Sequence, residues 1–376
     1  MAFALTGCRI FTGESFLEDH AVLIVDERIH AVLPRADAQV LDMRDLGGGL
    51  LAPGFIDVQV NGGGGALLND NPSVETVRTI ATAHRRFGTV GMLPTVITDA
   101  PGIIRQAVES VADAMAQKMP GILGIHIEGP FLDPARKGAH VARFIREMEQ
   151  GDVEEISGFA SRLPVMLTLA PNRVSQSMVR MLSAQGVLVS LGHSDASHDE
   201  ARLALGAGAR AFTHLYNAMS QMNGREPGMV GAALSDAESF VGIIADGHHV
   251  HDAALRVAFA AKRPDRMMLI TDAMPTAAGG PSSFDLQGRE VQHSNGRLEL
   301  SDGTLAGSNL TMDEAVRYCV KTLGLDLAQS LRMASLNPPS FLRRDHELGR
   351  IAPGHLASLV HLGDDLAVKA TWIDGR

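Results

Sequence analysis

Cysteine and long hydrophobic runs are scarce in this sequence. Cys8 and Cys319 are the only two cysteines among 376 residues, which excludes the disulfide framework of a small secreted protein and fits a reducing compartment. Runs without a charged residue reach fourteen residues, at Met181–Ser194 and Ala211–Gly224, short of the ~18 that a membrane-spanning helix needs. Residues 1–10 also lack the basic start and long apolar run of a signal peptide. A cytoplasmic protein with no membrane association is therefore expected.

Positive charge and aromatic residues are also in short supply. The 33 lysines and arginines are outnumbered by 43 aspartates and glutamates, giving a net charge of −10, and aromatic residues make up 4%. A protein that binds nucleic acid or an anionic membrane surface needs a basic face, so neither partner is expected. A small anionic substrate remains possible, because a few local cations can bind one phosphate whatever the global charge.

What the sequence does contain is a regular β/α rhythm that starts at Gly54. Most of the β-rich runs are continuously apolar, which is typical of strands buried on both faces. Helix-compatible segments such as Ser73–Phe87 and Asp252–Ala261 separate them. Eight such units predict a (β/α)8 TIM barrel rather than an open doubly wound sheet. The expected strands are Phe55–Val60, Val90–Val96, Ile122–Glu128, Val165–Leu169, Val187–Leu191, Arg210–Thr213, Val241–Ala245 and Met267–Thr271.

The two ends of the chain have a different pattern. Residues 1–52 and 351–376 contain short strand-forming segments separated by turns, so they are predicted to form one small β-sandwich domain beside a barrel at 53–350. Phe284–Leu300 is predicted to be a hairpin that turns at Asn295-Gly296. A helix at Met312–Leu323 is predicted to follow, capped by Asn309 or Thr311.

Polar residues follow four of the predicted strands. Active sites of TIM barrels lie at the C-terminal ends of the strands, and Glu128, His193, His214 and Asp272 occupy that position on strands three, five, six and eight. Two imidazoles and a carboxylate with an open fourth position are the ligand set of a catalytic zinc. A further carboxylate beside them suits the proton transfers of metal-assisted hydrolysis.

Each of these residues alone has a structural explanation. A single histidine after a buried strand is more often a hydrogen-bonded structural residue, Glu128 could pair with a cation, and Asp272 could cap a helix. The coincidence of all of them at strand ends favours a site. His126 lies two residues before Glu128 and therefore points the same way but deeper, so it is interpreted as a packed support.

Several motifs together resemble N-acetylglucosamine-6-phosphate deacetylases, which are members of the amidohydrolase superfamily. The resemblance runs from about Gly47 to Pro353. It rests on Pro53–Asp57 (PGFID), Gly124–Phe131 (GIHIEGPF), Lys137–His140 (KGAH), Gly192–Ser194 (GHS), Thr213–Met219 (THLYNAM), Gly224–Gly228 (GREPG), Ala245–His249 (ADGHH) and Thr271–Ala273 (TDA).

The resemblance implies a role for each matching residue in a metal-dependent deacetylation of N-acetylglucosamine 6-phosphate. Asp272 would act as general base and then general acid, and His140 would polarise the acetyl carbonyl. Arg225 would reach the neighbouring active site of a homodimer and hold the 6-phosphate together with His249. The remaining implied residues are the metal ligands Glu128, His193 and His214, the sugar contacts Ala139, Asn217 and Ala218, and the closing loop Leu305, Ala306 and Gly307.

Strand one departs from the wider superfamily, many of whose members carry His-x-His there for a second metal. Gln59 and Asn61 occupy those positions, so one divalent ion per chain is expected, with Zn²⁺ the expected metal. The amides themselves are interpreted as hydrogen-bonding the substrate or the loop at Gly62–Gly65. Two alternatives stay open: another amidohydrolase, acting on a different amino-sugar phosphate or a cyclic amide, and a non-catalytic binding protein on the same barrel.

Overall fold

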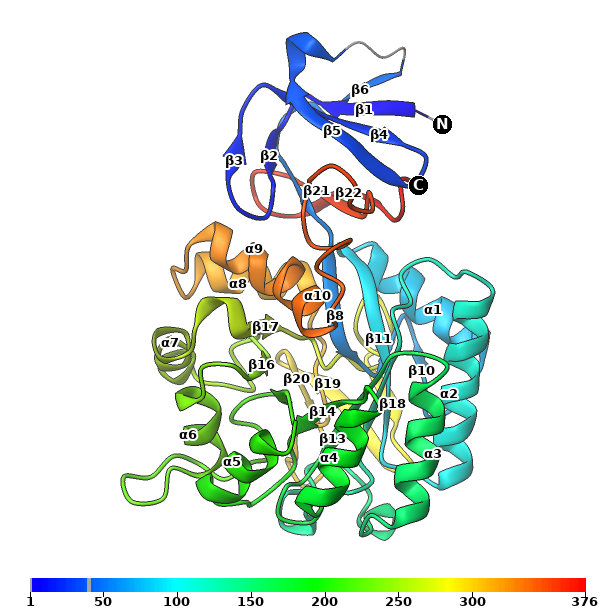
Figure 1. The fold of residues 1–376 in the computed structure, drawn as a ribbon, viewed down its shortest axis with the longest axis vertical. Coiled ribbons are helices and arrows are strands. Elements are labelled where there is room, and N and C mark those ends of the chain that lie inside the picture. The colour runs from blue at the N-terminus through cyan, green and yellow to red at the C-terminus, as the bar shows by residue number, and fades with distance from the viewer. Residues whose placement is uncertain (1, 39–41) are drawn as a thin grey trace.

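A parallel barrel and the helices around it form the lower part of the molecule in the view of Figure 1. The computed structural model describes residues 2–38 and 42–376. Each strand of an eight-stranded sheet pairs in parallel with its neighbours in the sheet, in chain order from the first to the last. The strands are β8 (Phe55–Val60), β11 (Thr89–Ile97), β12 (Ile125–Glu128), β13 (Val165–Leu169), β14 (Leu188–Leu191), β15 (Ala211–Phe212), β16 (Phe240–Ile243) and β17 (Met267–Leu269).

The two outer strands of this sheet meet where the end of β8 contacts the residues that follow β17. A parallel bridge joins Val60 to Ala273, and the Asp272 N–H donates to the Gln59 carbonyl at 3.0 Å. All eight strands are buried along their length, which explains their continuous apolar runs. The prediction of a (β/α)8 TIM barrel is therefore confirmed.

Helices surround the barrel, and most begin at a side chain suited to capping. Ser73 accepts a hydrogen bond from Thr76 N before the first helix, and Thr311 forms a capping box with Glu314 before the eighth, which identifies Thr311 rather than Asn309 as that cap. The helices are α1 (Val74–Arg85), α2 (Pro101–Ala116), α3 (Gln150–Ala160), α4 (Gln176–Ala184), α5 (His198–Gly206), α6 (Gly228–Ser235), α7 (Asp252–Ala261), α8 (Met312–Lys321), α9 (Leu327–Ser335) and α10 (Asn337–Phe341). Within residues 2–38 and 42–376, every helix is too short or too polar to cross a membrane.

Two small sheets lie beside the barrel (Figure 1), the first built from N-terminal residues and the second from both ends of the chain. One contains β1 (Ala2–Thr6), β4 (His20–Val25), β5 (Arg28–Pro34) and β6 (Met43–Asp45). The other contains β2 (Arg9–Phe11), β3 (Phe16–Leu17), β7 (Leu50–Pro53), β21 (Leu359–Leu362) and β22 (Val368–Trp372).

A single apolar cluster joins these two sheets. It includes Leu5 and Ile24 of the first sheet and Leu51 and Leu359 of the second, so the sheets pack face to face as a β-sandwich. The C-terminal strand β21 runs antiparallel to β7, which is how distant segments share one sheet. We propose domain boundaries at 52/53 and 350/351; residues 1 and 39–41 of the predicted segment lie outside the described residues.

A three-stranded sheet follows the barrel: β18 (Ser283–Asp285), β19 (Glu290–Ser294) and β20 (Arg297–Glu299). The turn between β19 and β20 is Asn295-Gly296, both with left-handed backbone, as a type I′ hairpin requires. The predicted turn at Asn295-Gly296 is confirmed, but Phe284–Leu300 is not a single hairpin, because a second turn after Asp285 divides its first arm into β18 and β19. The three strands form one antiparallel sheet, the hairpin sheet. Its apolar side chains pack in one cluster with Met274 and Ala306, at the C-terminal end of the barrel. Two short strands, β9 (Gly62–Gly63) and β10 (Ala66–Leu67), pair near the same end.

Candidate active site

Four polar side chains converge at the C-terminal end of the barrel. Glu128 is the last residue of β12, while His193, His214 and Asp272 follow β14, β15 and β17. The backbone of the last three residues is left-handed, with φ of 48°, 33° and 53°. Such values are uncommon outside glycine and collect at functional sites. Here these residues lie two or three residues after the last residue of their strands.

The closest contacts in the group join Glu128 to two imidazoles. Glu128 Oε1 lies 3.1 Å from His193 Nε2 and 3.0 Å from His214 Nε2, and the two nitrogens are 3.0 Å apart. Ligands ~2.0–2.1 Å from a tetrahedral zinc are about 3.3 Å from one another, so the three atoms have the spacing of a zinc ligand set. His193 Nδ1 lies 2.9 Å from the Arg136 carbonyl. A hydrogen bond there places the proton on Nδ1 and leaves Nε2 free to bind a metal.

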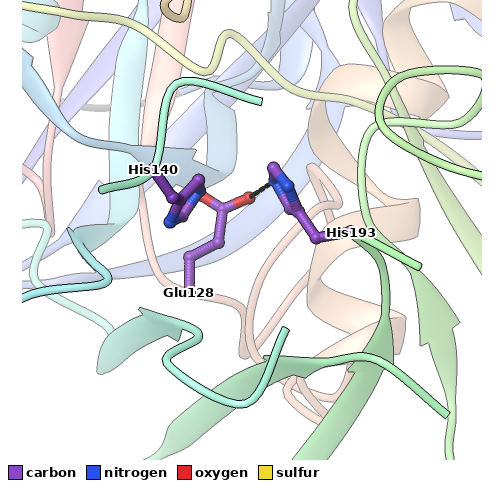
Figure 2. A group of neighbouring side chains, drawn as sticks. All are labelled: Glu128, His140 and His193. Atoms are coloured by element: carbon purple, nitrogen blue, oxygen red, sulfur yellow. Dashed lines mark hydrogen bonds and ion pairs between the residues drawn. The ribbon is translucent and has the colours of Figure 1, made fainter. Parts of the chain in front are cut away.

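His140 comes from a loop and faces the same group. Ligand atoms of Glu128, His140 and His193 all lie within 4.8 Å of one another, and the three side chains point toward a common centre (Figure 2). His140 and His193 meet edge to face, with ring centroids 4.4 Å apart. Burial, reinforced by His193, holds the pKa of His140 well below its ordinary value. The tighter 3.0 Å contacts of His214 favour His214 over His140 as the third ligand.

Asp272 lies beside this group and is held by two amides of strand β8. Its Oδ1 accepts hydrogen bonds from Gln59 Nε2 at 3.1 Å and Asn61 Nδ2 at 2.7 Å. The same Gln59 nitrogen lies 3.2 Å from both oxygens of Glu128. Gln59 therefore bridges the two carboxylates, while Asn61 holds Asp272 alone. Among the described residues neither amide bonds the loop at Gly62–Gly65, so that expectation is wrong, whereas a hydrogen bond to the substrate stays a prediction. Burial, followed by the nearby Glu128 charge, raises the pKa of Asp272 to about 6.

These side chains form the wall of a cavity of about 380 Å³, a size suited to a small ligand. Most predicted site residues line it: Glu128, Ala139, His140, His193, His214, Asn217, Ala218, His249, Asp272, Leu305 and Gly307. Asn61, which the sequence indicated as a contact of the substrate or the loop, also lines the wall. The wall further contains residues to which the sequence assigned no role, which are Ile97, Ala135, Arg136, Gly138, Met274 and Thr304. Ile97 is the last residue of β11, the position that Glu128 has on β12. The strand-end rule applied to every strand, and not only to polar residues, would have found it.

Two predicted residues do not line this cavity. Ala306 is fully buried and packs with Met274 and Leu298, because alternate residues of an extended segment point in opposite directions. Arg225 is exposed on the loop between β15 and α6, and within the described chain it is not part of the cavity wall.

Comparison with known proteins gives the same picture. Residues 50–376 match the Amidohydrolase family, and residues 2–51 match the NagA composite domain. The chain belongs to the amidohydrolase family. It is 43% identical to the N-acetylgalactosamine-6-phosphate deacetylase of Shewanella sp. (strain ANA-3), over 98% of this chain and 94% of that protein. It is 34% identical to the N-acetylglucosamine-6-phosphate deacetylase of Haemophilus influenzae, over 100% and 99%.

Solved structures agree with this assignment. The N-acetylglucosamine-6-phosphate deacetylase from Pasteurella multocida superimposes with a TM-score of 0.97 at 34% identity, covering 100% of this amidohydrolase and 99% of that chain. The enzyme from Mycobacterium smegmatis gives 0.92 at 32% identity, over 100% and 99%. Barrel and small sheets are therefore arranged as in these two proteins.

A buried hydrogen bond between His249 and Asp246 supports the cavity wall of this amidohydrolase on its β16 side. His249 Nδ1 lies 2.6 Å from Asp246 Oδ2, and the two side chains are 5% and 7% exposed. Asp246 Oδ1 also accepts from the backbone N–H of His248 and of His249. Although burial opposes ionisation, the hydrogen bond from His249 lowers the pKa of Asp246. His249 is therefore fixed with Nδ1 toward Asp246, leaving Nε2 for other contacts.

His126 lies below the site, as its position two residues before Glu128 predicts. It is completely buried, and its Nε2 lies 2.7 Å from Thr168 Oγ1. Thr168 in turn lies 2.7 Å from Thr213 Oγ1. Burial lowers the pKa of His126 to about 4, so the imidazole is neutral and belongs to a hydrogen-bonded floor of the barrel.

Asp57 in β8 is a second buried carboxyl group beneath the site. Its Oδ2 accepts from Thr271 Oγ1 at 2.5 Å, and burial raises its pKa to about 7 from an ordinary 3.8. Folding thus favours the protonated form. The resulting stability is fully present below about pH 4 and is lost as pH rises to about 7.

We predict that Asp57→Asn is more destabilising at pH 5 than at pH 8, because asparagine has no proton to lose. The difference between the two pH values should reach a few kcal/mol, of order 1.4 per pKa unit. Urea unfolding of wild type and variant at both pH values measures it. An equal cost at both would contradict the assigned pKa.

Proposed function

We propose that this amidohydrolase hydrolyses the acetamido group of N-acetylglucosamine 6-phosphate in the cytoplasm, giving glucosamine 6-phosphate and acetate. The observation that carries the proposal is the contact of Glu128 Oε1 with His193 and His214, 3.0–3.1 Å away, in a cavity that also contains Asp272. The deacetylases named above, which match the chain over nearly its full length, support the same reaction.

Glu128, His193 and His214 would hold one divalent ion per chain, and we propose Zn²⁺. The donor set fits, because imidazole and carboxylate are zinc ligands, and His193 Nε2, His214 Nε2 and Glu128 Oε1 form a triangle with sides of 3.0–3.1 Å. A bound divalent ion would supply a Lewis acid and lower the pKa of a water molecule.

The chain's own side chains then move the protons. Asp272 accepts the proton of the attacking water, because its raised pKa keeps it near the range of a useful base. It returns that proton to the amine nitrogen as the C–N bond breaks. His140, which is neutral, donates a hydrogen bond to the acetyl oxygen as negative charge develops there. Ala139, Asn217, Ala218, Leu305 and Gly307 line the remaining cavity wall and would contact the sugar.

His249 and Arg225 would bind the 6-phosphate. An imidazole held through Nδ1 by Asp246 leaves Nε2 for the phosphate, to which it would donate once the ring carries its second proton. An arginine fork matches phosphate oxygens. Since Arg225 is exposed and lies outside the cavity wall of its own chain as described, we propose that it reaches the site of the second subunit in a homodimer.

Arg225→Ala is predicted to shrink the preference for the 6-phosphate by roughly 10- to 100-fold, the value of a charge-assisted hydrogen bond. Activity on the unphosphorylated sugar, which never had this contact, should not change. Ratios of kcat/KM for the two sugars measure the effect, with Arg180→Ala on α4 as an exposed control.

Mixed dimers test the sharing of the site. When Arg225→Ala and Asp272→Asn proteins exchange subunits, one site of each mixed dimer has both intact groups, so activity should recover. No recovery after verified exchange would contradict a site shared between subunits.

A second candidate substrate is the C4 epimer, N-acetylgalactosamine 6-phosphate. It is favoured because relatives named as deacetylases of that epimer are 43% and 37% identical to the chain, above the 34–35% of relatives named for the gluco epimer. Acetate release by metal-replete protein from both epimers, each with and without its 6-phosphate, tests the proposal. Comparable turnover without phosphate would point to another amidohydrolase substrate, and no release with metal bound would point to a binding protein.

A further inference from the structure

The loop that carries Ala139 and His140 has little regular structure of its own. Only two short 3₁₀ turns, Pro134–Arg136 and Ala142–Phe144, interrupt it. One side of the loop is bonded to the His193 segment, because Asp133 N donates to the His193 carbonyl at 2.9 Å and the Arg136 carbonyl contacts His193 Nδ1. This side of the loop is therefore held by the segment after β14, which carries the proposed metal ligand His193.

The other side of the loop is bonded to the hairpin sheet by Arg289. Arg289 Nη2 donates to the Ala139 carbonyl at 2.5 Å. Arg289 lies between β18 and β19, in a segment anchored by its neighbour Gln287, whose Nε2 donates to the Thr98 carbonyl at 3.0 Å and to Asp99 Oδ2 at 2.7 Å. The hairpin itself is fixed by a buried apolar cluster. The arginine thus extends from a rigid support.

This hydrogen bond acts on the peptide unit that leads into His140. The Ala139 carbonyl and the His140 N–H belong to the same planar peptide. Its carbonyl accepts from Arg289, while its N–H donates to the Lys137 carbonyl at 3.1 Å. Both ends of the plane are therefore held, and the plane sets the direction in which the His140 side chain leaves the backbone.

We propose that Arg289 is a positioning residue that aligns the His140 imidazole with the acetyl oxygen of the substrate. The inference rests on the proposed function, in which His140 contacts that oxygen. A guanidinium suits the task because its planar, rigid fork fixes the direction of the bond to a carbonyl better than a flexible ammonium does.

Arg289→Ala should lower kcat by roughly 10- to 100-fold, the cost of a misplacement near 1 Å, with metal content and KM unchanged. In a His140→Ala background the same substitution should cost nothing more, because a residue that acts only through His140 has nothing left to align. Arg289→Lys should recover part of the loss. The matched control is Arg297→Ala, an exposed arginine of the same hairpin that pairs with Glu299 at 3.1 Å, which should keep wild-type kcat.

A second measurement does not depend on turnover. Diethyl pyrocarbonate should modify the imidazole of His140 several-fold faster in metal-replete Arg289→Ala than in wild type or Arg297→Ala, as read by peptide mass spectrometry. Unchanged labelling, or an additive loss in the His140→Ala background, overturns the inference. So does a rise in KM confined to the phosphorylated sugar, which would make Arg289 a phosphate ligand. A failure of the proposed function would give a different result, because wild type would then release no acetate. The labelling experiment would still decide whether Arg289 positions His140.

Discussion

Replacing Asp272 with asparagine should lower kcat by at least ~10²-fold, the low end for a positioned acid–base group. The reason is chemical rather than structural. Asparagine has nearly the same shape, and its Oδ1 can still accept the hydrogen bonds that Gln59 and Asn61 now donate to Asp272. It cannot, however, take a proton from water or return one to the amine. Metal content and thermal unfolding should therefore match wild type.

The control for this experiment is Asp199→Asn, which makes the same chemical change on a side chain that is 94% exposed. It should leave kcat unchanged. Acetate release at saturating substrate, measured alongside elemental analysis, gives both quantities. Near-native turnover by Asp272→Asn would show that a different group moves the protons.

Removing His214, one of the three proposed metal ligands, should lower activity by a comparable factor, because the protein would lose its metal ion. Wild-type protein purified with ample zinc and dialysed without chelator should hold about one equivalent per chain. His214→Ala should lose that ion and more than ~100-fold of its activity, since altering a group that merely orients a ligand already costs ~10–100-fold in affinity or activity.

Glu128 and His193 could bind the metal together with either His214 or His140. The His140→Ala variant distinguishes these two ligand sets. Because His214 Nε2 makes the 3.0 Å contacts, His140→Ala should keep its zinc while losing turnover. Zinc lost with His140 and retained without His214 would reverse the ligand assignment. Two tightly held equivalents in wild type would contradict the single-metal site, for which Gln59 and Asn61 replace the histidines of strand one.

The barrel was predictable because its strands are continuous apolar runs, which a sequence shows directly. Runs such as Val165–Leu169 are buried on both faces and bounded by turns, and this one is found with the same bounds. Helix α6 gave no such signal. Its sequence GMVGAALS contains two glycines and is buried nearly all round, so it lacks the polar face that identifies a surface helix.

The site was predictable where a strand end determines position. Glu128, His193, His214 and Asp272 are brought together because parallel strands end at one edge of the barrel. Contacts that depend on side-chain direction or on distant segments could not be read in this way. Examples are the bridge that Gln59 forms between two carboxylates, and Ala306, whose burial follows from packing against the hairpin.

The pairing of β7 with β21 has a consequence for synthesis. Ala52 lies opposite Val360 in that sheet, so β7 leaves the ribosome roughly three hundred residues before its partner, a wait of roughly 15–60 s at ~5–20 residues per second. During that time a four-residue apolar strand, buried throughout in the finished fold, has an unpaired edge open to other nascent chains. Premature termination anywhere in the barrel would make this exposure permanent, so truncated products should aggregate through β7 rather than accumulate as soluble fragments.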